Sequence, residues 1–144
     1  MVGQEEMMRV LVRTPLFSGL QRRQLERLAR RFVERKFDAG DVIVSQGKGG
    51  VGFFIVFSGE AEAVLQRGDG STIVLNPLGP GDFFGEMALM TDAMRSASVV
   101  AKTAVECFAL TRWDFLGILR EDAEMAVAVL QELAERFSRV MSTL

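Results

Sequence analysis

Short runs of β-branched and aromatic residues, separated by glycine-rich turns, fill the middle of the chain and constrain its fold more than any other feature. Eleven of the fourteen glycines lie between residues 40 and 85. The strand-like runs between the turns are residues 42–44, 53–57, 60–66, 72–75, 99–100 and 105–110. Many short strands at this spacing predict a β-sandwich, a barrel or a jelly roll. The run FFIVF at 53–57 does not alternate, so it is expected to be buried on both faces or to lie under a helix.

Helical patterns lie before and after this region. Residues 4–13 predict a short amphipathic helix that ends before Pro15, and residues 21–32 place apolar side chains at helical spacing. The five arginines of the second segment indicate a solvent-exposed face rather than a nucleic-acid surface. We therefore expect one domain, residues 1–144, mainly β with flanking helices: N-terminal helices in 1–35, a β-roll in 36–110 and C-terminal helices in 111–144.

A heptad pattern runs through the last predicted helix. Apolar residues recur there at alternating steps of three and four: Ala123, Ala126, Leu130, Leu133, Phe137, Val140 and Leu144. A seam of this kind joins two copies in a coiled coil, packs on the chain's own roll, or does both along its length. The pattern does not separate the two, so a homodimer through the C-terminal helix is one of two expectations.

Composition limits the chemistry that the chain can perform. The 144 residues are 49% hydrophobic and 25% charged, which is typical of a globular protein. Histidine is absent and Cys107 is the one cysteine, which excludes zinc sites and histidine-based catalysis and suits a reducing cytoplasm. The net charge of −2 argues against a nucleic-acid surface, and no apolar run approaches the roughly 20 residues of a membrane span. We therefore expect no metal, no cofactor, no catalytic residues, and neither nucleic acid nor membrane as a partner of this chain.

The stretch 83–98, FFGEMALMTDAMRSAS, carries the side chains with binding chemistry. Gly85 lets the backbone approach a ligand, and the helix formers after it would point N–H groups at an anion such as a phosphate. Arg95 offers a planar, permanently charged fork to the same phosphate, and Ser96 adds a hydroxyl donor. The Glu86 carboxylate would accept hydrogen bonds from sugar hydroxyls. Together these residues predict a cradle for a ribose phosphate.

The order Phe84-Gly85-Glu86-Met87-Ala88-Leu89, followed by Arg95-Ser96-Ala97-Ser98, resembles the phosphate-binding cassette of the cyclic-nucleotide-binding domain family. That family includes catabolite-activator-type bacterial regulators, protein kinase A regulatory subunits and cyclic-nucleotide-gated channels. The resemblance implies an eight-stranded jelly-roll-like β-roll, a double-stranded β-helix, with N-terminal helices and a long C-terminal helix. It also implies that Glu86 holds the ribose 2′-hydroxyl and that Arg95 holds the cyclic phosphate. The cassette residues expected to bind ligand are Phe84, Gly85, Glu86, Met87, Ala88, Arg95, Ser96 and Ala97.

The resemblance bears on positions outside the cassette as well. Val74, together with Phe84, is expected to form apolar walls for the sugar and base. Arg136 lies 41 residues after Arg95, the offset of the lid arginine in bacterial channel domains of the family, and either contacts the purine or pairs with Glu132. Lys48 stands where the family often has an acidic residue. Because this loop is expected to lie away from the phosphate, we expect the difference to have little effect on binding.

The function that the resemblance implies is a cyclic-nucleotide sensor whose C-terminal helix changes conformation when ligand binds. cAMP is the expected ligand because Ser96 is similar to cAMP-binding bacterial members, and cGMP is the alternative. Three alternative hypotheses for the role of this domain remain open. In the first it is the sensing half of a DNA-binding regulator, and in the second it is the gating domain of a channel or enzyme completed by further sequence. In the third it is a dimerisation scaffold that binds no nucleotide.

Overall fold

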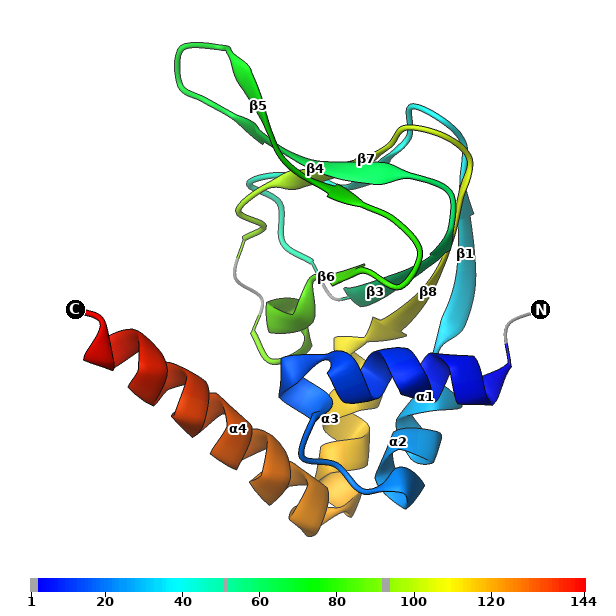
Figure 1. Ribbon diagram of the computed structural model, residues 1–144, viewed down its shortest axis with the longest axis vertical. Helices are drawn as coiled ribbons and strands as arrows, with labels where there is room; N and C mark the ends of the chain where they lie inside the picture. The colour runs from blue at the N-terminus through cyan, green and yellow to red at the C-terminus, as the bar shows by residue number, and fades with distance from the viewer. Residues whose placement is uncertain (1–2, 51, 92–93) are drawn as a thin grey trace. The chain divides into compact units, whose positions relative to one another are not determined.

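The computed structural model describes residues 3–50, 52–91 and 94–144. Internal contacts divide the chain into two units, each considered by itself below. A β unit comprises Phe32–Trp113, and a helical unit comprises the residues up to Arg31 together with Asp114–Leu144. In Figure 1 the β unit runs from cyan to yellow, and the helical unit is blue at one end of the chain and orange to red at the other.

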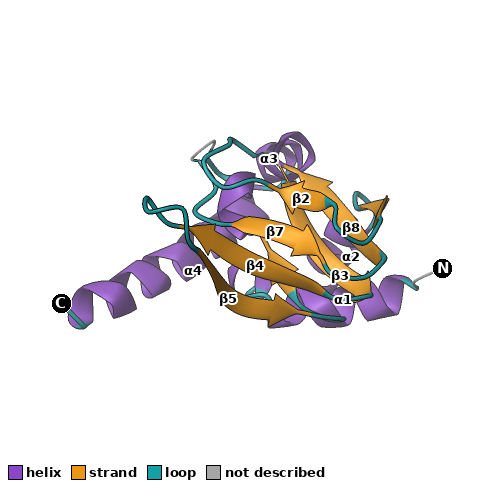
Figure 2. Ribbon diagram, turned by 90° about the horizontal axis from the view of Figure 1, so that it is seen from above, coloured by secondary structure: helices purple, strands orange, loops and turns teal. Residues whose placement is uncertain are grey.

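Eight strands form the described part of the β unit. They are β1 Val33–Phe37, β2 Val42–Val44, β3 Gly52–Ser58, β4 Ala61–Gln66, β5 Thr72–Leu78, β6 Phe83–Phe84, β7 Ser98–Ala101 and β8 Val105–Thr111. One antiparallel sheet has the order β1-β8-β3-β6, and the other has the order β2-β7-β4-β5, whose strands lie side by side in Figure 2. The eight-stranded jelly roll expected from the sequence is confirmed.

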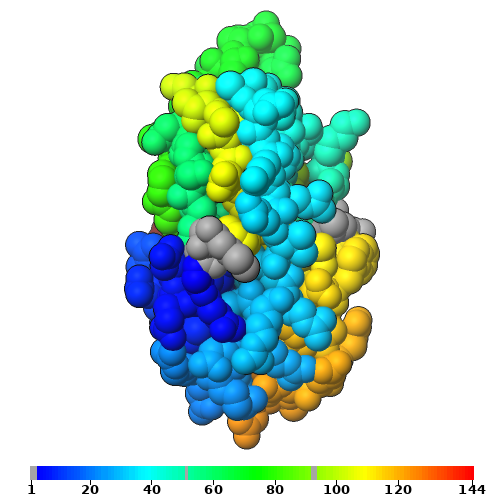
Figure 3. All heavy atoms as spheres, turned by 90° about the vertical axis from the view of Figure 1, so that its right-hand side faces the viewer, coloured from blue at the N-terminus to red at the C-terminus, as the bar shows by residue number. Residues whose placement is uncertain are grey.

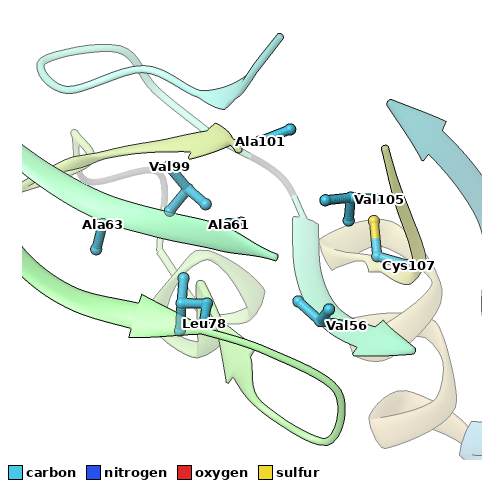
Figure 4. Packing of buried hydrophobic residues seen from close by; sticks show 8 residues of the cluster. All are labelled: Val56, Ala61, Ala63, Leu78, Val99, Ala101, Val105 and Cys107. Atoms are coloured by element: carbon cyan, nitrogen blue, oxygen red, sulfur yellow. The ribbon is translucent and has the colours of Figure 1, made fainter. Parts of the chain in front are cut away.

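The core of the β unit lies between the two sheets. Both sheets contribute to one apolar cluster, shown in Figure 4, of Val56, Ala61, Ala63, Leu78, Val99, Ala101, Val105 and Cys107. Strand β3 is an inner strand of its sheet, and Phe53, Ile55 and Val56 are all fully buried although neighbouring side chains point to opposite faces. The prediction of burial on both faces therefore holds for Phe53, Ile55 and Val56, whereas Phe54 and Phe57 are only partly buried. Burial raises the pKa of the Cys107 thiol to about 11, an effect that nearby Arg35 partly opposes.

Two strands were not predicted from the sequence. Strand β1 begins at Val33, three residues before the predicted start of the roll at residue 36. The preceding helix, α2 Arg22–Ala29, accordingly ends three residues before residue 32, where the sequence predicted the helix to end. The sequence VERKF of β1 gives little strand signal because this edge strand is mostly exposed and three of its five residues are charged. Strand β6 is only two residues long, and its Phe84 ring stacks on the ring of Phe54 with centroids 5.1 Å apart.

The helical unit contains α1 Gln4–Arg13, a 3-10 turn η1 Pro15–Phe17, α2, the part of α3 Arg112–Glu121 from Asp114 on, and α4 Ala123–Ser142. Its buried side chains include Leu11, Phe17, Leu28, Phe115 and Ile118, and the rings of Phe17 and Phe115 lie 5.9 Å apart. A capping box starts α2, where the Gln21 backbone N–H donates to Gln24 Oε1 at 2.9 Å. Asp122 caps α4 by accepting a hydrogen bond from the Met125 N–H at 3.1 Å.

The arginines of α2 form ion pairs within the helical unit. Arg22 pairs with Glu5, and Arg27 pairs with Glu121. The arginine-rich face of this helix thus contacts carboxylates of α1 and α3. In the described part of the chain, no helix has both the length and the apolar composition that crossing a membrane requires.

Candidate functional site

A cavity of about 420 Å³ opens in the β unit beside the 3-10 turn η2 Glu86–Leu89. This volume falls in the range of small-molecule sites. Eight residues that the sequence singled out line it together: Phe84, Gly85, Glu86, Met87, Ala88, Arg95, Ser96 and Ala97. These eight residues of the stretch 83–98 therefore border one cavity, and residues 92–93 of that stretch lie outside the described residues.

Gly85 turns the chain into this site. Its φ of 87° lies in the left-handed region, and a Cβ at this position would stand 2.7 Å from the Gly52 carbonyl oxygen. Only glycine fits both constraints. The Ala88 N–H then donates to the Gly85 carbonyl at 3.0 Å, which is the first hydrogen bond of the turn. The Met87 N–H lies before this first bond and so does not take part in the hydrogen bonding of the turn. The helical turn expected after Glu86 is a 3-10 turn of four residues.

Arg95 is the cation of the cavity. Its Nη2 donates to the Gly52 carbonyl at 2.8 Å, and its Nε is buried with no hydrogen-bond partner among the described residues. Among the described residues no carboxylate forms an ion pair with it. Burial lowers the pKa of Arg95 below its ordinary value, but the guanidinium stays charged near neutral pH. The cavity thus contains a partly desolvated positive charge that forms no ion pair among the described residues, although the Glu86 carboxylate lines the same cavity.

The loop between β2 and β3 fixes the position of Arg95. The Gly47 N–H donates to the Arg95 carbonyl and the Arg95 N–H donates to the Lys48 carbonyl, both at 2.8 Å. A Cβ on Gly50 would collide with the Arg95 guanidinium. The expectation that the loop of Lys48 lies away from the phosphate cradle was therefore wrong, because this loop contacts Arg95 through both its backbone and its glycines.

The remaining lining residues were not identified from the sequence. They are Val44, Ala63, Thr91, Met94 and Val99, of which Val44, Ala63 and Val99 lie on β2, β4 and β7. Val74, expected as an apolar wall, lies outside this lining on the edge strand β5 and is 55% exposed. A bulge between Ala63 and Val64 shifts the pairing of β4 with β5, and no feature of the sequence marks that shift. Arg136 lies on α4, in the helical unit.

Comparisons with known proteins agree on one family. A family model described as the cyclic nucleotide-binding domain matches residues 34–122. The cyclic AMP receptor protein of Thermus thermophilus is 35% identical over 123 residues, covering 85% of this chain and 57% of that protein. A cAMP-dependent protein kinase regulatory subunit of Aspergillus fumigatus is 38% identical over 109 residues, covering 76% of this chain and 26% of that protein.

Among solved structures, the N-terminal domain of a transcriptional regulator from Streptomyces coelicolor superposes with a TM-score of 0.85 at 29% identity. The match covers 93% of this chain and 94% of that domain. By contrast, the chain spans little more than half of the Thermus relative and about a quarter of the Aspergillus relative.

Proposed function

The chain belongs to the cyclic nucleotide-binding domain family, and we propose that it is a cAMP sensor domain that responds through its C-terminal helix. The observation that carries the proposal is that Glu86 and Arg95 line one cavity, with the glycine turn at Gly85 beside them. In this proposal Arg95 binds the cyclic phosphate, and Glu86 accepts a hydrogen bond from the ribose 2′-hydroxyl. The relatives named for cyclic AMP support that nucleotide over cGMP.

The role of these residues is binding rather than bond cleavage. Arg95 supplies fixed positive charge and Glu86 supplies an acceptor. The partly desolvated environment of Arg95 makes its charge–phosphate hydrogen bonds stronger than they would be in water. We infer that the chain is a regulatory module without catalytic activity of its own, in line with the receptor and regulatory-subunit relatives.

We also propose that α4 is the element that responds. If ligand binds one arrangement of α4 better than another, the population shifts by that difference in affinity. Arg136 on α4 is the residue that we expect to contact the purine, by stacking or by hydrogen bonding to its edge. Replacing Arg136 by alanine would then weaken nucleotide binding and reduce the response of α4 together.

A homodimer through α4 is a further part of the proposal. Leu130, Phe137, Val140 and Leu144 of the heptad seam are between 59% and 91% exposed. Exposed apolar side chains at coiled-coil spacing favour pairing of two copies over packing on the same chain.

Calorimetric titration with cAMP and cGMP tests the proposed function. We expect wild-type protein to bind cAMP with a Kd of about 1 µM or tighter, which corresponds to about −8 kcal/mol or stronger. Arg95→Ala removes up to two charge-assisted hydrogen bonds of about 1.5–3 kcal/mol each, so affinity should fall by about two orders of magnitude or more. Arg67→Ala, an exposed arginine outside the cavity lining, is the matched control. Negligible heat from both nucleotides would overturn the proposal.

A further inference from the structure

A second cavity of about 530 Å³ lies on another side of Arg95 in the β unit. It shares Arg95 and Val44 with the first cavity but otherwise draws on different residues from β1, β2, β3 and β8 and the loop before β3. Figure 3 shows the face of the molecule where the cyan surface of β1 borders the yellow surface of β8. The family resemblance assigns nothing to this cavity.

The polar side of the second cavity is strongly cationic. Arg35, Lys48 and Arg95 all line it, and its described lining contains no aspartate or glutamate. None of these three cations forms an ion pair with a carboxylate in the described part of the chain. In a protein whose net charge is −2, three uncompensated positive charges around one hollow favour an anion there.

The other side of the same cavity is apolar. Phe37, Ile43 and Phe54 line it, and each is partly buried against the core cluster between the sheets. Arg35 and Lys48 are exposed, so the charges stand where solvent enters and the aromatic and aliphatic side chains lie deeper. A ligand that matches this layout has an apolar body and an anionic head group.

We propose that this second cavity binds a small aromatic or aliphatic carboxylate. The carboxylate head group contacts Lys48 and Arg35, and the apolar body lies against Phe37, Ile43 and Phe54. This site differs from the nucleotide cavity in its chemistry. The first cavity contains a carboxylate, Glu86, that can accept hydrogen bonds from hydroxyl groups. In the second cavity every charged side chain of the described lining is a cation that donates hydrogen bonds.

The test uses 1-naphthoate as the probe and the full chain without any nucleotide, so its outcome does not depend on the proposed function. Amide resonances in a proton–nitrogen NMR titration should shift saturably at Ile43, Phe54 and Ala109, with a Kd of about 1 mM or tighter at low salt. Lys48→Glu should weaken binding at least tenfold. Arg35→Gln provides a second variant with a milder change. Naphthalene-1-methanol, which lacks the charge, should bind at least tenfold more weakly than the acid.

Lys102→Glu is the matched control, because it makes the same change in net charge at an exposed lysine outside both cavities. It should leave naphthoate affinity within twofold of wild type. The proposal is overturned if shifts are confined to Glu86, Ala88 and their neighbours, if they do not saturate, or if Lys102→Glu weakens binding as much as Lys48→Glu does.

Discussion

Replacing Gly50 by alanine tests whether the loop before β3 sets the position of Arg95. An ideal Cβ at residue 50 would stand 2.6 Å from Arg95 Cζ, whereas ordinary carbon contacts are about 3.5–4.0 Å. The guanidinium must therefore move by about 1 Å. Because Gly50 does not have a positive φ, the backbone itself accepts alanine, and the collision is the only penalty.

A shift of that size breaks the 2.8 Å hydrogen bond from Arg95 Nη2 to the Gly52 carbonyl, since such bonds fail beyond about 3.2–3.5 Å. We expect the unliganded variant to lose about 1 kcal/mol of stability. Loss of one of two charge-assisted bonds to a phosphate would weaken cAMP binding by about 1.5–3 kcal/mol, or roughly 10- to 100-fold. Titration calorimetry and urea unfolding measure the two effects separately.

The same substitution in an Arg95→Ala background isolates the cause. Without the guanidinium the alanine side chain has room, and Gly50→Ala should then stabilise the protein by about 0.4–1 kcal/mol by restricting the unfolded chain. Gly68→Ala, where an added Cβ meets nothing within 4 Å, is the control for both backgrounds. The reasoning is refuted if Gly50→Ala changes stability with the same sign and size whether or not Arg95 is present.

Three other expectations follow from the structure. The raised pKa of Cys107 means that the folded state holds the thiol proton more tightly than the unfolded state does. The contribution of this group to the free energy of unfolding should therefore be fully present below pH 9 and fall by about 2–3 kcal/mol as pH rises to about 11. Urea unfolding at each pH measures this slope, and Cys107→Ala should remove it. Phe137→Glu should give a monomer in sedimentation where wild type gives a dimer, while Ser138→Glu, one residue off the seam, should not. Saturating 1-naphthoate should weaken cAMP binding severalfold in calorimetry because both cavities share Arg95, and an unchanged Kd would argue against that coupling.

Much of the fold was predictable because it depends on local signals. Six of the strands coincide with runs of β-branched and aromatic residues, and the glycine-rich turns between them mark where the chain reverses. Strand β1 was not predicted because VERKF is an exposed edge strand. Its extended conformation is stabilised by pairing with β8, for example with Arg35 opposite Cys107. Pairing with a distant strand leaves no trace in the local pattern.

The candidate site likewise contains some residues that the sequence identified and others that it did not. Residues that act through their own chemistry, above all Glu86 and Arg95, were recognisable in the cassette and lie on one cavity. Residues that contribute by having no side chain, and so leave room for the Arg95 guanidinium, were not recognised. Gly50 and Gly52 read only as turn formers, although one leaves room for the guanidinium and the other supplies its hydrogen-bond acceptor. A cluster of glycines in a loop can therefore indicate close approach by a side chain from far along the chain, here 45 residues after Gly50.

Arg95 is held in the unliganded protein by a neutral group, and this affects stability. The Gly52 carbonyl offers a partial negative charge, which offsets only part of the desolvation that lowers the arginine's pKa. Arg95→Ala should therefore leave unliganded stability unchanged or raise it by up to about 1 kcal/mol in urea unfolding, relative to the Arg67→Ala control. Wild type should gain about 2.7 kcal/mol at a cAMP concentration of 100 times Kd, and the variant should gain almost nothing. If Arg95→Ala instead loses more than about 1 kcal/mol without ligand, a typical net value for one hydrogen bond, Arg95 is part of the scaffold and an anion is not needed to account for its placement.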